Sequence, residues 1–120
     1  MTNREKKFLS DILNSIELIE LFLKEINSFT QYQLDMKTKG AVERHIAIIG
    51  EAVNQFLKES PDNSFENAVQ IVSVRNRLIH AYDSIDDSII WSIITLHLQS
   101  FKEEVSKKII PELPPKISDD

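Results

Sequence analysis

The chain has 120 residues, and 19 Asp and Glu against 14 Lys and Arg give it a formal net charge of −5 at pH 7. With no cysteine and two glycines, it excludes disulfide frameworks, thiolate zinc sites, cysteine nucleophiles and glycine-rich phosphate loops. Its length is that of one domain, and its charge excludes a surface coated in basic residues for binding duplexes.

Apolar residues at helical spacing predict a first helix over Arg4–Asn27. The stripe consists of Phe8, Ile12, Ile16, Ile19, Leu23 and Ile26. Ser28 then begins a short segment, and we expect a helical turn or linker over Phe29–Asp35.

A second long helix is predicted over Lys37–Leu57, with a stripe of Val42, Ile46, Ile49, Val53 and Phe56. The turn and cap residues at Ser60–Asn63 end it. We expect a third helix to follow Ser64, with Glu66 and Asn67 in its first turn.

The last long helix is expected to begin near Ser84, which with Asp87 is similar to a capping box, and to end at Pro111. Residues 1–111 then form one helical domain, and residues 112–120 form a flexible tail. Four main helices with short connections predict an all-α, up-and-down four-helix bundle with a short extra helix or turn.

Neither a targeting segment nor a membrane span is predicted. The segment Met1–Lys7 is polar and charged, with no apolar signal-peptide core behind it. The longest uncharged stretch, Ser88–Phe101, has 14 residues, whereas a span needs about 20. We therefore expect a cytoplasmic protein with a buried helix at Ser88–Phe101.

The end of the third helix contains an unusual concentration of polar side chains, namely Arg75, Asn76, Arg77, His80 and Tyr82. On a helix, Asn76 lies one turn before His80 and shares its face. Arg75 and His80 diverge by about 140°, so they converge only through the reach of arginine, a bent helix end or a second chain.

These residue types suit phosphodiester chemistry. Histidine can remove a proton from a ribose 2′-OH or protonate a leaving oxygen, and arginine binds phosphate and stabilises charge on its oxygens. Asn76 could orient the imidazole or hold the sugar. Such a site needs neither metal nor cofactor, and His45, His80 and His97 do not form a metal-ligand pattern.

The string Arg-x-x-x-x-His-x-Tyr at Arg75, His80 and Tyr82 resembles the motif of HEPN-domain proteins of the HepT type, the toxins of HepT/MntA toxin–antitoxin pairs. Ala41–Arg44 followed by Ile48–Ala52 resembles the same family's second-long-helix signature. The likeness covers about residues 4–110 in order, length and helix pattern.

The resemblance implies a metal-independent endoribonuclease that works as a homodimer, with both motifs facing a cleft between the chains. By position, Arg75 would bind phosphate, His80 would act as general acid and base, and Asn76 would be a polar helper. An antitoxin of the MntA nucleotidyltransferase type would silence the enzyme by transferring AMP to Tyr82, because added bulk and negative charge repel RNA.

Structural interpretations of the same residues stay open. His80 could be a helix-terminal histidine stabilised by the helix dipole, and Tyr82 a packing residue. Arg77 is either a solvated or ion-paired side chain or a substrate contact. Arg44 and Glu51 share a face, extended by Gln55; an ion-pair network that braces one of the motif arginines is favoured over substrate binding.

Gly50, inside the second long helix, favours a close approach of another helix, since glycine there costs about 1 kcal/mol relative to alanine. Two other functions compete with the ribonuclease. One is a non-catalytic HEPN-like module that partners a nucleotidyltransferase, and the other is a purely structural helical dimer.

Overall fold

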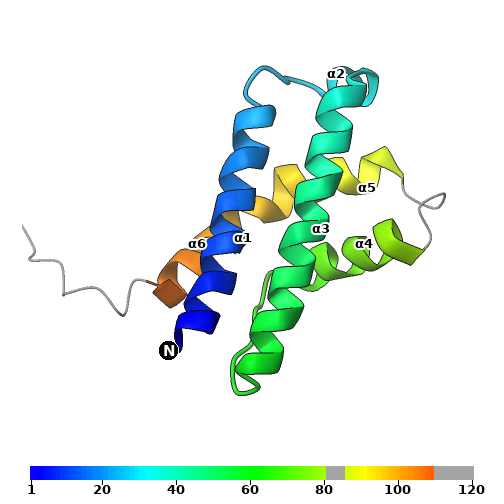
Figure 1. Ribbon diagram of the computed structural model, residues 1–120. Helices are drawn as coiled ribbons and strands as arrows, with labels where there is room; N and C mark the ends of the chain where they lie inside the picture. Colours follow the sequence, from blue (N-terminus) through cyan, green and yellow to red (C-terminus); the bar gives the residue numbers. More distant parts are fainter. Residues whose placement is uncertain (81–85, 110–120) are drawn as a thin grey trace, which may run out of the picture.

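The computed structural model describes residues 1–80 and 86–109, and every regular element within these ranges is helical (Figure 1). The elements are α1 Asn3–Phe22, α2 Phe29–Leu34, α3 Met36–Glu59, α4 Val69–His80, α5 Asp87–Ser92, the π-helical segment η2 Ile93–His97 and α6 Leu98–Ile109. The predicted all-α fold is confirmed, and α2 is the short extra helix. No helix in the described part of the chain is both long and apolar enough to cross a membrane.

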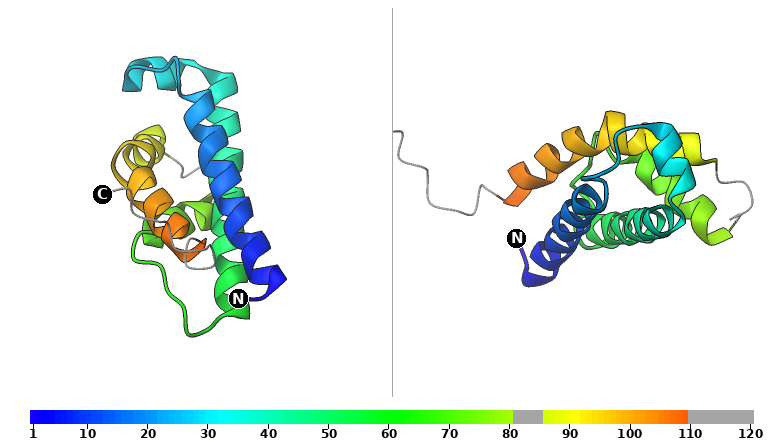
Figure 2. Two further views of the ribbon diagram at one scale, coloured as in Figure 1. Left: turned by 90° about the vertical axis from the view of Figure 1, so that its left-hand side faces the viewer. Right: turned by 90° about the horizontal axis from the view of Figure 1, so that it is seen from above.

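The helices form two layers. Helices α1 and α3 lie side by side in one layer, and α2 joins them at one end (Figure 1). The continuous series α5, η2 and α6 crosses behind this pair, and α4 packs against α3 on the same side (Figure 2). This arrangement leaves the C-terminal end of α4 at the edge of the molecule.

The predicted apolar stripes supply the core between these layers. Its fully buried side chains include Ile12, Ile16 and Ile19 of α1, Ile46, Ile49 and Phe56 of α3, Ile71 of α4, and Ile90 and Phe101 of the second layer. The rings of Phe56 and Phe101 both contact that of Phe65, with centroid distances of 5.4 and 5.6 Å. Phe65 thereby fixes the segment that connects α3 to α4 against α6.

The first and last helices differ from their predicted bounds. Helix α1 ends at Phe22 rather than near Asn27, because a tight turn follows, in which the amide of Ile26 donates to the carbonyl of Leu23 (2.9 Å). At the last helix, Asp86 caps α5 by accepting from the backbone amide of Ser88 (2.8 Å), and the helix begins at Asp87. The predicted capping box of Ser84 and Asp87 falls partly outside the described residues. Ser84, Pro111 and the tail lie outside the described residues.

The third helix begins at Val69, later than the prediction of a start just after Ser64. The carboxylate of Glu104 in α6 accepts hydrogen bonds from the backbone amides of Glu66 (2.7 Å) and Asn67 (3.1 Å) and from the Asn67 side chain (3.0 Å). These residues therefore form a turn that is tied to α6 instead of the first turn of α4.

Candidate active site at the end of helix α4

Arg75 is held in place from two sides. Its guanidinium pairs with the carboxylate of Glu51 on α3, and its Nη1 donates to Oδ1 of the neighbouring Asn76 (2.9 Å). The Glu51 carboxylate also accepts from Nε2 of Gln55 one turn along α3 (2.9 Å). Since the Arg75 side chain is 18% exposed, its guanidinium is fixed yet still accessible at the surface.

Gly50 makes this arrangement possible. A Cβ atom at this position would lie 2.6 Å from Cγ of Arg75, which is closer than real Cβ contacts allow. The absence of a side chain thus lets α4 approach α3 closely enough for Arg75 to reach Glu51. This is the close helix approach that the glycine inside the helix suggested.

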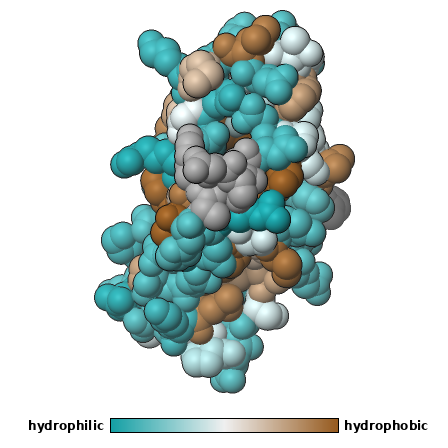
Figure 3. All heavy atoms as spheres, turned by 90° about the vertical axis from the view of Figure 1, so that its right-hand side faces the viewer, coloured by the Kyte–Doolittle hydropathy of each residue, from teal (hydrophilic) through white to brown (hydrophobic). Residues whose placement is uncertain are grey.

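His80 lies in the last turn of α4 and is exposed. Asn76 and Arg77, four and three residues earlier, are also exposed and flank its face of the helix. The side chains of His80 and Arg77 form no ion pair or hydrogen bond with another residue within 1–80 and 86–109. The imidazole is therefore open to a ligand on the protein surface. On the visible part of this side of the molecule, hydrophilic residues are interspersed with separate hydrophobic patches (Figure 3).

Asn76 connects the two parts of this cluster. It contacts the Arg75 guanidinium directly and lies one turn before His80 on the same face. The straight helix still separates the directions of Arg75 and His80 by about 140°. Within one chain, Arg75 therefore points toward α3 while His80 points away from it, as the helical spacing predicts.

The Glu51 carboxyl is kept ionised by its neighbours. Hydrogen bonding from the Gln55 amide, followed by the positive charge and hydrogen bond of Arg75, lowers its pKa below the ordinary value. A carboxylate that is charged at neutral pH is the partner needed to hold a guanidinium in one orientation. Glu51 therefore braces Arg75 through an ion pair, as the sequence favoured for this face of the helix.

The remaining candidates divide between this cluster and the rest of the molecule. Arg44 is exposed on α3, two turns before Glu51, and takes no part in the Glu51–Arg75 pair. Tyr82 lies outside the described residues. His45 is bound to Ser15 (3.0 Å between Oγ and Nδ1) and lies against Phe22, where burial lowers its pKa.

Sequence reasoning singled out Glu51 and Gln55 on this face of α3 but missed Asn54 and Lys58, which also lie near Arg75. Asn54, Gln55 and Lys58 line a surface hollow of about 410 Å³ together with Glu51 and Arg75. The available signal was their spacing, since positions 51, 54, 55 and 58 recur at three and four residues and share one face of a helix. No group of His, Asp or Glu side chains in the described ranges could hold a metal ion.

Comparison with known proteins shows which family this chain resembles. A family model described as Ribonuclease HepT-like matches residues 12–108. The chain is 35% identical over 111 residues to the "Probable ribonuclease HepT" of Thermococcus cleftensis, covering 89% of this chain and 97% of that protein. It is also 34% identical over 110 residues to a protein of Methanocaldococcus jannaschii named as a "Putative RNase", covering 88% and 97%. No solved structure gives a significant match.

Proposed function

The chain belongs to the HepT-like ribonuclease family, and on that basis we propose that Arg75, Asn76 and His80 form its metal-independent RNA-cleaving site. The membership confirms the HepT type and the endoribonuclease class predicted from the sequence. The roles of individual residues, the dimer, the antitoxin and the cytoplasmic location are parts of the proposal.

In the proposed reaction, the imidazole of His80 removes the proton from a ribose 2′-OH. The 2′-oxygen then attacks the adjacent phosphorus, the bond to the 5′-oxygen breaks, and a protonated imidazole returns a proton to that leaving oxygen. The products are a 2′,3′-cyclic phosphate and a 5′-OH end. Arg75 stabilises the negative charge that grows on the phosphate oxygens in the transition state.

The observation that carries this proposal is the fixed guanidinium of Arg75 on the same helix end as the exposed imidazole of His80. Glu51 and Asn76 hold the guanidinium at two of its nitrogens, so little conformational entropy is lost when a phosphate binds.

The proposed enzyme is a homodimer in which two α4 ends share one cleft. In one chain, Arg75 and His80 point in directions about 140° apart, and a second chain removes this separation by supplying its own His80 or Arg75 to the same phosphate. An antitoxin of the MntA nucleotidyltransferase type would act at Tyr82, two residues after His80, by forming a phosphodiester bond between AMP and the tyrosine oxygen with release of pyrophosphate from ATP.

The test is RNA cleavage by the purified chain in the presence of EDTA, with Arg75→Ala and His80→Ala as variants. We expect at least a hundredfold loss of cleavage in both variants and no loss in Lys107→Gln, which removes an exposed cation from α6. Intact RNA with the wild-type chain, together with a stable nucleotidyltransferase complex, would favour the non-catalytic binding module instead. Mass spectrometry after coexpression tests the addition of AMP at Tyr82.

A further inference from the structure

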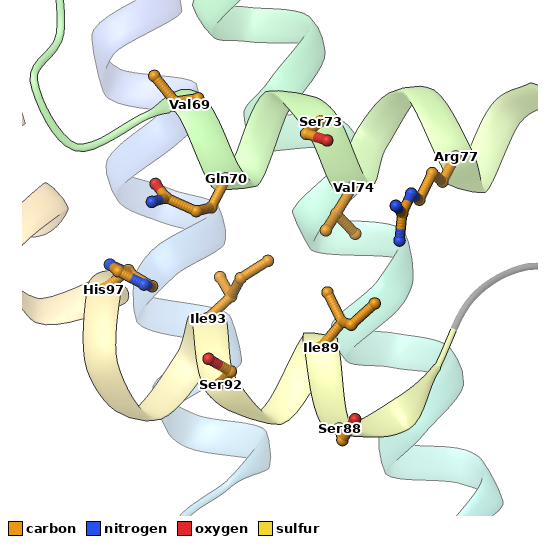
Figure 4. A pocket seen from close by; sticks show the side chains of 10 residues that line it. All are labelled: Val69, Gln70, Ser73, Val74, Arg77, Ser88, Ile89, Ser92, Ile93 and His97. Atoms are coloured by element: carbon orange, nitrogen blue, oxygen red, sulfur yellow. The ribbon is translucent and has the colours of Figure 1, made fainter.

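A groove lies between α4 and the opposing α5 and η2 segment, with a volume of about 540 Å³ (Figure 4). Gln70, Ser73 and Arg77 line it from α4, and Ser92, Ile93 and His97 from the other side. This volume lies within the range of pockets that bind small organic molecules. None of the roles proposed above uses this groove.

The groove has an apolar floor and polar ends. Val74 and Ile93, which are 3% and 2% exposed, form the floor. Arg77 lies at one end, and Gln70 and His97 lie at the other (Figure 4). An apolar surface with a cation at one end and hydrogen-bonding groups at the other suits a nucleotide, which has a flat base and an anionic phosphate.

One end of the groove adjoins the proposed catalytic histidine. Arg77 lies three residues before His80 and Ser73 lies seven before it, so all three lie along one side of α4. The rise of a helix places them about 4.5 and 10 Å from His80 along its axis. A strand of RNA whose phosphate reaches His80 would therefore place a neighbouring nucleotide over the groove.

We propose that this groove binds one unpaired nucleotide next to the scissile phosphate of the substrate RNA, and so contributes to the choice of cleavage site. This inference rests on the proposed ribonuclease function. The Arg77 guanidinium would contact the phosphate of that nucleotide, and the base would lie against Val74 and Ile93. The side chains of Gln70 and His97 would then contact the edge of the base.

The composition of the groove favours RNA over a helix of another protein. A docked helix would present an apolar stripe, which suits the aliphatic floor alone. Six of the ten lining residues instead have polar side chains of the hydroxyl, amide, imidazole or guanidinium type, and one of these carries a full positive charge. Arg77 also has no acidic partner among the residues that the structure describes. Unpaired RNA supplies both the phosphate and the apolar face that these groups require.

The experiment uses short RNAs that differ only in the base on either side of one mapped cleavage site. Ser73→Trp fills the groove from an exposed position, and Ser100→Trp adds the same ring on α6 as its control. We expect Ser73→Trp to lower kcat/KM about tenfold or more and to reduce the differences between bases, while Ser100→Trp cleaves like the wild-type chain. Arg77→Gln, compared with Lys107→Gln, should raise KM with a smaller change in kcat.

A second measurement separates this inference from the proposed function. An RNA with a 2′-deoxy sugar at the cleavage site lacks the attacking 2′-OH, so its binding can be measured without cleavage. The groove proposal would be wrong if Ser73→Trp and the wild-type chain bound this RNA equally and showed the same base preference. If cleavage were still lost in His80→Ala, the proposed ribonuclease function would stand. If the wild-type chain cleaves nothing, weaker binding by Ser73→Trp still supports the groove, and equal binding overturns it. Loss of self-association in Ser73→Trp, measured by sedimentation, would identify the groove as a protein interface and overturn the inference.

Discussion

Gly50 of α3 lies directly against the side chain of Arg75 on α4, so closely that a Cβ atom on the glycine would be 2.6 Å from Cγ of the arginine. The contact sets the distance between the two helices at the point where Glu51 binds the guanidinium. A single residue without a side chain thus links helix packing to the orientation of the proposed phosphate-binding group.

Gly50→Ala should therefore impair both stability and cleavage. The added methyl group would force α4 and Arg75 away from α3, and such overpacking costs about 1–3 kcal/mol of unfolding free energy. Gly40→Ala is the matched control, because nothing lies within 4 Å of its Cβ position in the same helix. It should raise the stability by about 0.5–1 kcal/mol and leave cleavage unchanged. Urea unfolding and RNA cleavage measure the two effects, and a harmless Gly50→Ala would contradict the packing argument.

Glu51→Gln should reduce cleavage far more than it reduces stability. The variant keeps the size of the side chain but removes the charge that orients Arg75, and misplacement of such a group costs about 10- to 100-fold in rate. Because the Glu51 side chain is 46% exposed, we expect the unfolding free energy to fall by less than about 1 kcal/mol. Glu59→Gln, which removes the surface partner of Arg4, is the control and should cleave normally. An equal loss in both variants would exclude a specific role for Glu51.

Acid should remove the contribution of Glu51 to stability. The Gln55 amide and, after it, Arg75 lower the pKa of this carboxyl below its ordinary value of 4.5 in the folded chain. A group of this kind stabilises the fold fully above its unfolded-state pKa, and the stabilisation is lost as the pH falls through the lower, folded-state pKa. The difference in unfolding free energy between wild type and Glu51→Gln should thus be constant from pH 8 to about 5 and shrink below that. Urea titrations between pH 3 and 8 measure it, and a constant difference down to pH 3 would contradict this assignment.

Glu104→Ala should destabilise the beginning of α4. The Glu104 carboxylate accepts from the backbone amides of Glu66 and Asn67, and because these hydrogen bonds are exposed and part-buried, each one lost costs about 0.5–1.5 kcal/mol. Glu103→Ala, next to it on the exposed side of α6, is the control and should change the stability by less than about 0.5 kcal/mol. Thermal unfolding of both variants tests this, and similar midpoints would show that α6 does not anchor the turn.

Tyr32→Phe should be neutral or stabilising. The Tyr32 hydroxyl is buried without a hydrogen-bond partner in the described part of the chain, so the fold bears a desolvation cost of about 1–3 kcal/mol that phenylalanine avoids. Burial, and then the charges of Glu43 and Asp87, raise the pKa of this phenol. Its folded-state pKa therefore exceeds the unfolded one, and wild-type stability should decline above about pH 10 while the variant lacks this decline. Unfolding at pH 7 and pH 11 tests both points, and a marked loss of stability at pH 7 would reveal a hydrogen bond to the hydroxyl.

The sequence alone determined which faces of the helices are buried. The stripes in Arg4–Asn27 and Lys37–Leu57 predicted α1 and α3 because apolar side chains at spacings of three and four can be buried only on one side of a helix. The same local geometry placed Asn76 on the face of His80 and pointed Arg75 elsewhere. These relationships follow from the rotation per residue and need no partner helix.

Tertiary contacts determined where α4 begins, which the spacing of residues within the segment does not specify. Glu104 of α6 delays the start of α4 to Val69, although Glu66 and Asn67 follow Ser64 as first-turn residues would. Residues 38 positions apart form this contact, and no periodicity within a segment reports it.

The choice between the two motif arginines is also tertiary. From the sequence, the carboxylate of Glu51 could brace either Arg75 or Arg77, and Gly50 could favour a close approach by any helix. Only the packing of α4 on α3 assigns Arg75 to Glu51 and turns Arg77 toward the groove beside η2. The sequence determined the chemistry available at the end of α4, and the way the helices cross determined which of these groups can act together, because side chains from different helices meet only where the backbones approach closely enough.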